Sequence, residues 1–403
     1  MRHIVIIGAG QAGAALAARL RALGFDGAIT LIGQEVAPPY QRPPLSKAYL
    51  LGEMEEQRLY LRPAGWYTDN DITLRTDTTA VAVDPVTRTV TLETKEVLTY
   101  DHLALTTGAR PIALPESIAG NLWGVLTIRT LGCADGMAPY LEKGGKTLVV
   151  GGGYIGLEAA AVAAKKGLDV TLVEQAPRIL QRVAAPETSD YFRDLHQSHG
   201  VTIKENCGLT SLSGDQYAAH AVLSDGTDLD IDSCIVGIGI QPNTELAESA
   251  SLDIDHGIAT DEMGRTSDPY IWAAGDCASL EVRGQRMRIE SVQNAIDQAE
   301  AVAANMLGAD TPYQPKPWFW SDQYDIKLQI AGLNTGYDEV LVRQGDKPGA
   351  VSHWYFGKGQ LLAVDAMNDP RAYMIGKRLI EAGRTPDRAA LTDGTELKTL
   401  LAA

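Results

Sequence analysis

His3-Ile-Val-Ile-Ile-Gly8-Ala-Gly10-Gln-Ala-Gly13 opens the chain, and a stretch rich in alanine and leucine follows from Ala14 to Leu23. Residues 3–7 are a short, mostly β-branched run, which predicts a strand buried on both faces. Gly24 ends the helical stretch, and Ala28-Ile-Thr-Leu-Ile32 predicts a second strand. A strand, G-x-G-x-x-G, a helix and a strand, in this order, form the pattern that a dinucleotide-binding βαβ unit requires.

Each glycine of this loop has its own task. Gly8 permits the tight turn, Gly10 lets the backbone approach a pyrophosphate, and Gly13 lets the helix pack closely on the strand. The N–H groups of the helix N-terminus then face the pyrophosphate. After the second strand, either Gln34 or Glu35 is placed to hold an adenosine ribose.

The same unit recurs in the middle of the chain. Thr147-Leu-Val-Val150 predicts the first strand, and Gly151-Gly-Gly153-Tyr-Ile-Gly156 is the loop. The helix is expected from about Leu157 to Lys166 and the second strand from Asp169 to Val173. Glu174 follows at the usual spacing of an acid that binds a ribose 2′-hydroxyl. A carboxylate there repels a 2′-phosphate, so the spacing favours NADH over NADPH.

Two copies of the pattern, each in a full βαβ context, are hard to explain as ordinary glycine turns. One chain that binds two dinucleotides suggests that one of them reduces the other. A hydride that passes from a nicotinamide to a flavin is the obvious pairing.

Composition excludes several other classes of function. The 403 residues are 45% hydrophobic and 21% charged, which predicts a packed globular protein. The formal net charge of −16 argues against a nucleic-acid or anionic-membrane binder, although a local basic patch is compatible with it.

Cysteine usage and hydropathy add to this. Four cysteines without a C-x-x-C pair predict neither a disulfide scaffold nor a zinc site, and they fit a reducing compartment. The apolar start breaks at Gly8 and Gly10, which indicates a strand rather than a signal peptide. No apolar run of about 18 residues predicts a transmembrane helix.

Six further segments resemble a known family. They are Pro39-Tyr-Gln-Arg-Pro-Pro-Leu-Ser-Lys47, Thr106-Thr-Gly-Ala-Arg-Pro111, Gly237-Ile-Gly-Ile-Gln-Pro-Asn243, Ala273-Ala-Gly-Asp-Cys-Ala278, Ile289-Glu-Ser-Val-Gln-Asn-Ala295 and Trp318-Phe-Trp-Ser-Asp-Gln-Tyr-Asp325. With the two glycine loops, they make essentially the whole chain resemble the FAD-dependent, NADH-dependent ferredoxin reductases of bacterial cytochrome P450 and Rieske oxygenase systems. The first and last of the six segments are the most specific.

The resemblance implies an α/β fold of the glutathione-reductase type, with two Rossmann-like dinucleotide-binding domains and a small α+β C-terminal domain. The FAD domain would comprise residues 1–110 and 236–312, and the NAD domain residues 111–235. Residues 313–403 would shield the flavin and dock the partner. Proline-rich residues 311–317 support the last boundary. Strand-like runs follow at Lys327–Ala331, Glu339–Arg343 and Leu361–Val364.

By the same resemblance, Lys47 and Glu158 have catalytic roles. The Lys47 ammonium would lie beside the flavin and stabilise the reduced ring electrostatically; the ordinary alternative is a solvated loop lysine. Glu158 would pair with Lys47 and face the nicotinamide. Its alternative role is that of an acid in the first helical turn, which complements the helix dipole.

Two aromatic residues are also implicated. Tyr154 would gate the nicotinamide pocket and stack near the flavin, unless it serves only helix–strand packing. Trp320 would lie by the flavin on the side that the iron–sulfur partner approaches. Alternatively, Trp318, Phe319 and Trp320 form a core cluster, and at least one of them is expected in the core because side chains alternate along a strand.

The resemblance also implies contacts with the cofactors. Asp276 would bind the ribityl chain at a helix N-terminus, or cap that helix, or do both. Arg42 and Arg129 would contact the FAD phosphate or adenosine unless they are surface residues, and Val81 would contact adenine through its backbone. Gly239 would admit the nicotinamide end of NADH. The remaining cofactor-binding positions are Ala12, Gly108, Ile155 and Val292.

The implied activity begins with hydride transfer from NADH to FAD. Single electrons then pass to a [2Fe–2S] ferredoxin that feeds a cytochrome P450 or a Rieske oxygenase, in a cytoplasmic monomer or weak homodimer. Lys327 is a candidate for a basic docking patch. No metal site is expected, and the absence of cysteine from residues 35–60 argues against thiol chemistry.

Two kinds of alternative stay open. One is the same half-reaction with rubredoxin, monodehydroascorbate or a quinone as the acceptor. The other is a redox sensor that resembles apoptosis-inducing factor, although the net acidity of the chain disfavours that reading.

Overall fold

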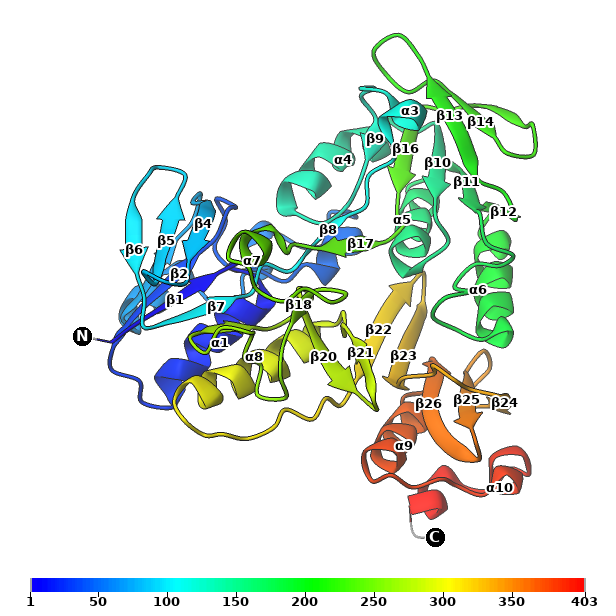
Figure 1. Cartoon of the computed structure of the whole chain (residues 1–403). Helices are drawn as coiled ribbons and strands as arrows, with labels where there is room; N and C mark the ends of the chain where they lie inside the picture. The colour runs from blue at the N-terminus through cyan, green and yellow to red at the C-terminus, as the bar shows by residue number, and fades with distance from the viewer. Residues whose placement is uncertain (1, 402–403) are drawn as a thin grey trace. The chain divides into compact units, whose positions relative to one another are not determined.

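The computed structural model describes residues 2–401, and the chain separates into two compact units (Figure 1). The first unit contains residues 1–41, 56–110 and 240–317. The second contains residues 42–55, 111–239 and 318–403. Each unit is therefore built from three separate segments of the chain.

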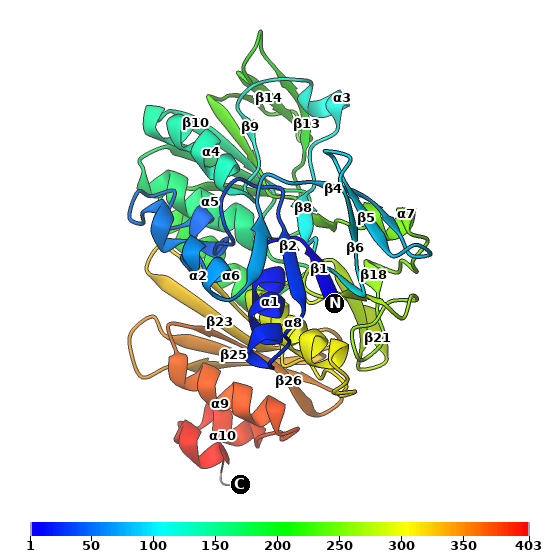
Figure 2. The same ribbon diagram turned by 90° about the vertical axis from the view of Figure 1, so that its left-hand side faces the viewer.

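A five-stranded parallel sheet forms the centre of the first unit, in the order β19-β7-β1-β2-β3. Ile4 and Ile6 point into one hydrophobic cluster and Val5 and Ile7 into another, so β1 is buried on both faces. Helices α1 and α8 lie side by side in both views (Figure 1, Figure 2) and pack on one of these clusters. The elements are β1 (His3–Ile7), α1 (Gln11–Ala22), β2 (Ala28–Ile32), β3 (Ile72–Arg75), β7 (His102–Leu105), β19 (Ile271–Ala273) and α8 (Val292–Met306).

Smaller elements complete the first unit. Two three-stranded sheets have the orders β4-β5-β6 and β18-β20-β21. The bounds are α2 (Ala64–Asp69), β4 (Ala80–Asp84), β5 (Thr89–Leu92), β6 (Val97–Thr99), β8 (Ala109–Pro111), β17 (Ile240–Pro242), α7 (Glu245–Ser249), β18 (Ile258–Ala259), β20 (Ala278–Val282) and β21 (Gln285–Met287).

A second parallel sheet, in the order β12-β11-β10-β16-β9, lies in the second unit. Its strand β10 is buried from Thr147 to Val150, and Leu148, Val149 and Val150 are apolar, as the sequence predicts. The elements here are α3 (Glu116–Ala119), β9 (Val125–Leu126), α4 (Leu131–Lys143), β10 (Lys146–Val150), α5 (Tyr154–Lys165), β11 (Asp169–Glu174), α6 (Pro186–Ser198), β12 (Thr202–Glu205), β13 (Leu209–Ser213), β14 (His220–Leu223), β15 (Asp228–Asp230) and β16 (Ser233–Val236).

The C-terminal part of the second unit contains an antiparallel sheet of order β22-β23-β26-β25-β24, with α9 packed on β26 (Figure 2). Gln323 pairs with Ile326, so Tyr324 and Asp325 form a two-residue hairpin turn. The elements are β22 (Trp318–Gln323), β23 (Ile326–Gly332), β24 (Glu339–Gln344), β25 (Val351–Gly357), β26 (Gln360–Met367), α9 (Pro370–Glu381) and α10 (Arg388–Thr392).

The two parallel sheets and the C-terminal antiparallel sheet confirm the expected fold class. The expected helix starts at Ala14 and Leu157 were wrong by three residues, because α1 begins at Gln11 and α5 at Tyr154. The third glycine of each loop is therefore inside the helix. A Cβ on Gly13 would lie 2.0 Å from the carbonyl oxygen of Gly8, so only glycine lets the helix start against its own loop.

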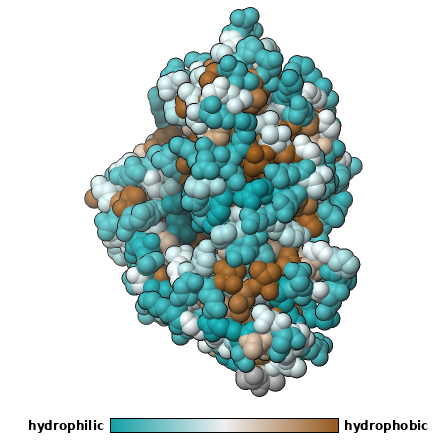
Figure 3. Space-filling model, turned by 90° about the vertical axis from the view of Figure 1, so that its right-hand side faces the viewer, coloured by the Kyte–Doolittle hydropathy of each residue, from teal (hydrophilic) through white to brown (hydrophobic). Residues whose placement is uncertain are grey.

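Hydrophilic residues cover most of the face in Figure 3, as the charge of the chain suggests. Within residues 2–401, no helix combines the length and the hydropathy that crossing a membrane requires.

Candidate functional site

The first glycine loop leaves open space in front of a helix. Gly8 has φ +110°, and a Cβ there would lie 2.1 Å from the carbonyl oxygen of Thr106. A Cβ on Gly10, by contrast, would meet no atom within 4 Å. Gly10 is also the N-cap of α1, and no side chain caps this helix. The first N–H groups of α1 thus face open space.

The second loop repeats this geometry. Gly151 has φ +105°, and its Cβ would lie 2.4 Å from the carbonyl oxygen of Gly237. Gly153, the N-cap of α5, again faces open space and has no capping side chain. Helices α4 and α8 differ, because Thr130 and Ser291 cap them by accepting from backbone N–H groups.

Both loops therefore fit a pyrophosphate. The N–H groups that no side chain caps, together with the positive end of the helix dipole, would bind the pyrophosphate oxygens. A side chain at Gly10 or Gly153 would occupy the space of the pyrophosphate.

The acid after the second βαβ unit lies against its glycine loop. Glu174 accepts hydrogen bonds from the backbone N–H of Gly152 at 2.7 Å and of Ala176 at 2.8 Å. In the first unit, Glu35 accepts from the hydroxyl of Tyr40 at 2.5 Å, whereas Gln34 is exposed. The choice between Gln34 and Glu35 thus stays open in the structure.

Lys47 and Glu158 form a buried ion pair inside the second unit. The Lys47 Nζ lies 2.6 Å from Glu158 Oε2, and the side chains are 16% and 2% exposed. Ser46 Oγ also donates to Oε2, at 2.7 Å, and Ser321 Oγ donates to Oε1, at 2.7 Å. A buried charge requires such partners.

This geometry corrects the helix-dipole alternative for Glu158. Because α5 begins at Tyr154, Glu158 is the fifth residue of the helix and lies beyond its first turn. The first turn contains no acidic residue. The carboxylate is held by side chains from two distant segments instead.

The aromatic residues lie together near the start of α5. The ring of Tyr154 packs on Phe319 with centroids 5.0 Å apart, and its shielded hydroxyl has no partner among residues 2–401. Burial, and then the charge of Asp365, raise the pKa of Tyr154. Trp318, Phe319 and Trp320 are each half-buried, and Trp318 packs against the C-terminal core. Trp318 thus meets the expectation that at least one of the three contributes to the core, although none of the three is fully buried.

Asp276 does not begin a helix, contrary to expectation. The chain turns there into β20, and α8 begins only at Val292 with Ser291 as its cap. The N-cap alternative for Asp276 is therefore wrong, while its expected contact with the ribityl chain stays a prediction. The cap was expected because aspartate is a preferred N-cap residue, but here the next residues pair in a sheet.

The other expected residues have definite places. Arg42 Nη1 donates to the carbonyl oxygen of Arg129 at 2.7 Å. Gly239 has φ +119° and is open on one side apart from Ile112 and the guanidinium of Arg182. The predicted site residues divide between the two units. The first unit contains Gly8, Gly10, Ala12, Gly13, Gln34, Glu35, Val81, Gly108, Asp276 and Val292. The second unit contains Arg42, Lys47, Arg129, Gly151, Gly153, Tyr154, Ile155, Gly156, Glu158, Glu174, Gly239 and Trp320.

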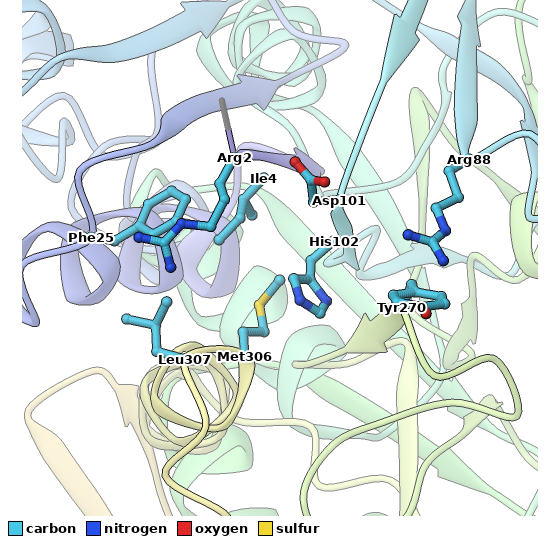
Figure 4. A pocket seen from close by; sticks show the side chains of 9 residues that line it. All are labelled: Arg2, Ile4, Phe25, Arg88, Asp101, His102, Tyr270, Met306 and Leu307. Carbon is cyan, nitrogen blue, oxygen red and sulfur yellow. The ribbon is translucent and has the colours of Figure 1, made fainter.

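A cavity of about 250 Å³ lies in the first unit (Figure 4). His102 is the first residue of β7, and Met306 is the last residue of α8. The cavity is thus at the amino-terminal edge of the sheet, whereas the glycine loop follows the carboxyl end of β1. Nucleotides bind at the carboxyl ends of parallel strands, so this cavity is not the dinucleotide site.

Sequence reasoning missed a buried acid in the C-terminal sheet. Asp365 on β26 accepts from the hydroxyls of Tyr355 and Thr188, the latter at 2.9 Å. Burial raises the pKa of Asp365 to about 6. No local motif marks this residue, because its partners come from β25 and α6.

Asp365→Asn should stabilise the protein at neutral pH. The folded state favours the neutral acid, since the pKa is about 6 when folded and about 4 when unfolded. The free energy of unfolding should therefore fall by roughly 3 kcal/mol as the pH rises from about 4 to above 6. The variant should melt at a higher temperature than the parent at pH 7.5 and at nearly the same temperature at pH 4. The exposed Asp325→Asn is the control, and an equal effect of both substitutions would refute the assignment.

A known protein family matches the part of the chain that contains both glycine loops. Residues 2–299 match the family described as pyridine nucleotide-disulphide oxidoreductase. The chain belongs to this family. Residues 318–401 match a second model, described as reductase C-terminal.

Relatives of this pyridine nucleotide-disulphide oxidoreductase include proteins named as ferredoxin reductases. The chain is 44% identical to rhodocoxin reductase of Rhodococcus erythropolis, over 97% of this chain and 92% of the relative. The putidaredoxin reductase–putidaredoxin complex has a TM-score of 0.95 at 38% identity, over 100% of this chain and 98% of that one. The ferredoxin reductase for the CYP199A2 system of Rhodopseudomonas palustris has a TM-score of 0.96 at 38% identity, over 100% of both chains.

Proposed function

We propose that this oxidoreductase takes electrons from NADH through FAD and passes them singly to a [2Fe–2S] ferredoxin of a cytochrome P450 or Rieske oxygenase system. The observation that carries this proposal is the pair of uncapped helices α1 and α5, each behind an open glycine loop. The similarity to rhodocoxin reductase, and to a reductase seen in complex with putidaredoxin, supports a ferredoxin as the acceptor.

In this proposal, the loop at Gly8, Gly10 and Gly13 would hold the pyrophosphate of FAD, and the loop at Gly151–Gly156 that of NADH. FAD supplies the ability to accept a hydride and to release electrons one at a time. Glu174 would accept from the ribose hydroxyls of NADH. Its position against Gly152 supports this role, because the carboxylate already borders the loop.

The side chains of the protein then position and stabilise charge. Glu158 holds the ammonium of Lys47 in a fixed place, and the pair is largely shielded from water. A fixed positive charge would favour the anionic reduced ring. Tyr154 would cover the nicotinamide pocket, and Trp320 would shield the ring on the partner's side. Lys327, which is exposed on β23, would contribute to a basic docking patch.

The remaining cofactor contacts also belong to the proposal. The hydrogen bond between Arg42 and Arg129 supports a shared role for these two residues near FAD. The others are Ala12, Gln34 or Glu35, Val81, Gly108, Asp276 and Val292 toward FAD, and Ile155 and Gly239 toward NADH.

The setting is part of the same proposal. We place the protein in the cytoplasm as a monomer or weak homodimer. The four cysteines are all free thiols, which suits a reducing compartment.

An anaerobic titration with NADH tests the proposal. The flavin spectrum of the FAD-loaded protein should bleach with NADH, far less with NADPH, and recover on addition of an oxidised [2Fe–2S] ferredoxin. Recovery of the flavin spectrum only with rubredoxin, monodehydroascorbate or a quinone would identify that compound as the electron acceptor in place of a ferredoxin. Slow bleaching and a long-lived complex with NAD⁺ would favour a redox sensor. The absence of a flavin spectrum after reconstitution with FAD would refute the proposal.

A further inference from the structure

A chain of buried hydrogen bonds leads from the Lys47–Glu158 pair to the tip of the β22–β23 hairpin. It uses Ser321, Gln323 and Tyr324, which belong to the same segment as Trp320 but have no role in the function proposed above. His196 on α6 completes the chain. Ser321, Gln323 and His196 are all fully buried.

Four hydrogen bonds form the chain, and all of them lie inside the second unit. Ser321 Oγ lies 2.7 Å from Glu158 Oε1, and Gln323 Nε2 lies 3.1 Å from Ser321 Oγ. Gln323 Oε1 lies 2.8 Å from His196 Nε2. The hydroxyl of Tyr324 lies 3.2 Å from His196 Nδ1. Ser321, Gln323 and His196 each bond to one side chain before them and one after them in this series. The proton positions in the four hydrogen bonds therefore depend on one another.

The ion pair fixes the direction of the chain. Lys47 and Ser46 both donate to Glu158, so the carboxylate is an ionised acceptor, and Ser321 donates its only proton to it. Ser321 Oγ must then accept from the amide N–H of Gln323. The amide oxygen of Gln323 is consequently left to accept from His196.

This direction determines the tautomer of His196. Burial lowers the pKa of His196 to about 4, so the ring is neutral near pH 7. The proton on the ring must then be on Nε2, because Gln323 Oε1 can only accept. Nδ1 carries a lone pair and accepts from Tyr324. A remote carboxylate and the tautomer of a buried imidazole are thus linked.

The backbone at Tyr324, where the hydrogen-bond chain ends, is itself conformationally constrained. Tyr324 has φ +57°, a conformation in which tyrosine is rare and which hairpin turns normally give to glycine or asparagine. Its ring stacks on His199 with centroids 3.7 Å apart, and it makes a T-shaped contact with His196 at 5.1 Å. Such strained residues persist where the surroundings fix them.

We propose that Ser321, Gln323 and His196 are positioning residues, which fix the orientation of the Glu158 carboxylate toward Lys47. The role of the Lys47–Glu158 pair in this proposal rests on the proposed function. The existence of the hydrogen-bond chain does not. The three residues act through Glu158 and touch no substrate.

NMR of the FAD-loaded protein with ¹⁵N-labelled histidine tests the chain without any NADH. The resonance of His196, identified among seven histidines by its loss in His196→Asn, should report a neutral ring with the proton on Nε2. Glu158→Gln should move that proton to Nδ1. Lys47 and Ser46 would hold the carbonyl oxygen of the new amide, so its NH₂ group would face Ser321 and reverse every later hydrogen bond.

Glu142→Gln, an exposed change on α4, is the matched control and should leave the His196 resonance unchanged. Gln323→Glu is a second, isosteric variant in case Glu158→Gln does not fold. It places a carboxylate beside His196, which should then carry protons on both nitrogens. A proton on Nδ1 in the parent, or no response of His196 to either variant, would overturn the proposal.

Rapid-mixing kinetics test the positioning role. Ser321→Ala removes one of three donors to Glu158, so the rate constant for flavin reduction at saturating NADH should fall about tenfold. The NADH concentration at half-saturation should stay within about a factor of two. Ser213→Ala, an exposed change on β13 of the same unit, is the control.

An unchanged rate constant in Ser321→Ala would refute the positioning role. If NADH does not reduce the parent protein, the proposed function fails, while the NMR result still decides the chain.

Discussion

Gly10→Val should yield a folded protein without FAD, whereas Gly153→Val should keep FAD and lose its affinity for NADH. Both glycines are extended, with φ −92° and −79°, and valine adopts this conformation readily. A Cβ at either position meets no protein atom within 4 Å, so folding should survive. The branched side chain would occupy the space of the pyrophosphate instead. Loss of two hydrogen bonds between backbone N–H groups and the charged pyrophosphate corresponds to at least about a 100-fold weaker affinity for the dinucleotide.

Two measurements check this pair. Absorbance of the purified proteins gives the FAD content, and calorimetric titration of Gly153→Val gives the affinity for NADH. Gly65→Val on α2 and Gly136→Val on α4 are controls, because their Cβ atoms also meet open space but neither residue belongs to a glycine loop. Full FAD content in Gly10→Val would contradict the assignment of the first loop.

Lys47→Met should destabilise the second unit by about 3–5 kcal/mol, because it leaves the Glu158 carboxylate buried with only two hydroxyl donors. The double variant Lys47→Met/Glu158→Gln should recover most of the lost stability, since a neutral amide no longer needs a counter-charge. Flavin reduction by NADH should be slow in both variants. The recovery of stability without recovery of rate would separate the structural from the electrostatic contribution of Lys47.

Urea unfolding followed by the fluorescence of the tryptophans measures the stability of these variants. The exposed pair Arg75–Glu96 provides the comparison, with side chains 28% and 45% exposed. Arg75→Met should cost much less stability than Lys47→Met, because water screens such exposed pairs. Equal losses for Lys47→Met and Arg75→Met would show that the buried pair is not strongly coupled.

The sequence predicts the two βαβ units well because their signals are local. Buried strands such as Ile4–Ile7 are apolar without interruption, and the glycines follow at fixed spacing. The helix starts were misplaced because each helix was expected to follow the last glycine of its loop. Close packing on the loop instead requires Gly13 and Gly156 inside the helix.

Other features depend on contacts between distant segments. Glu158 receives donors from Ser46 and Ser321, 112 and 163 positions away, and no local pattern marks such partners. Asp365 reads as one acid in an apolar strand, and only the folded sheet shows that it is buried. The turn at Asp276 likewise depends on the pairing of β20 with β18, which local preference does not reveal.

The three-segment construction of each unit has a consequence for synthesis on the ribosome. Strand β7 ends at Leu105, and its neighbour β19 begins at Ile271. At about 5–20 residues per second, this edge of the sheet waits roughly 10–30 s for its last parallel strand. During that time β7 presents unpaired backbone groups in a nascent chain that already exposes apolar surface. The protein should therefore engage ribosome-associated chaperones during translation, and its yield should fall more steeply than its stability when they are limiting.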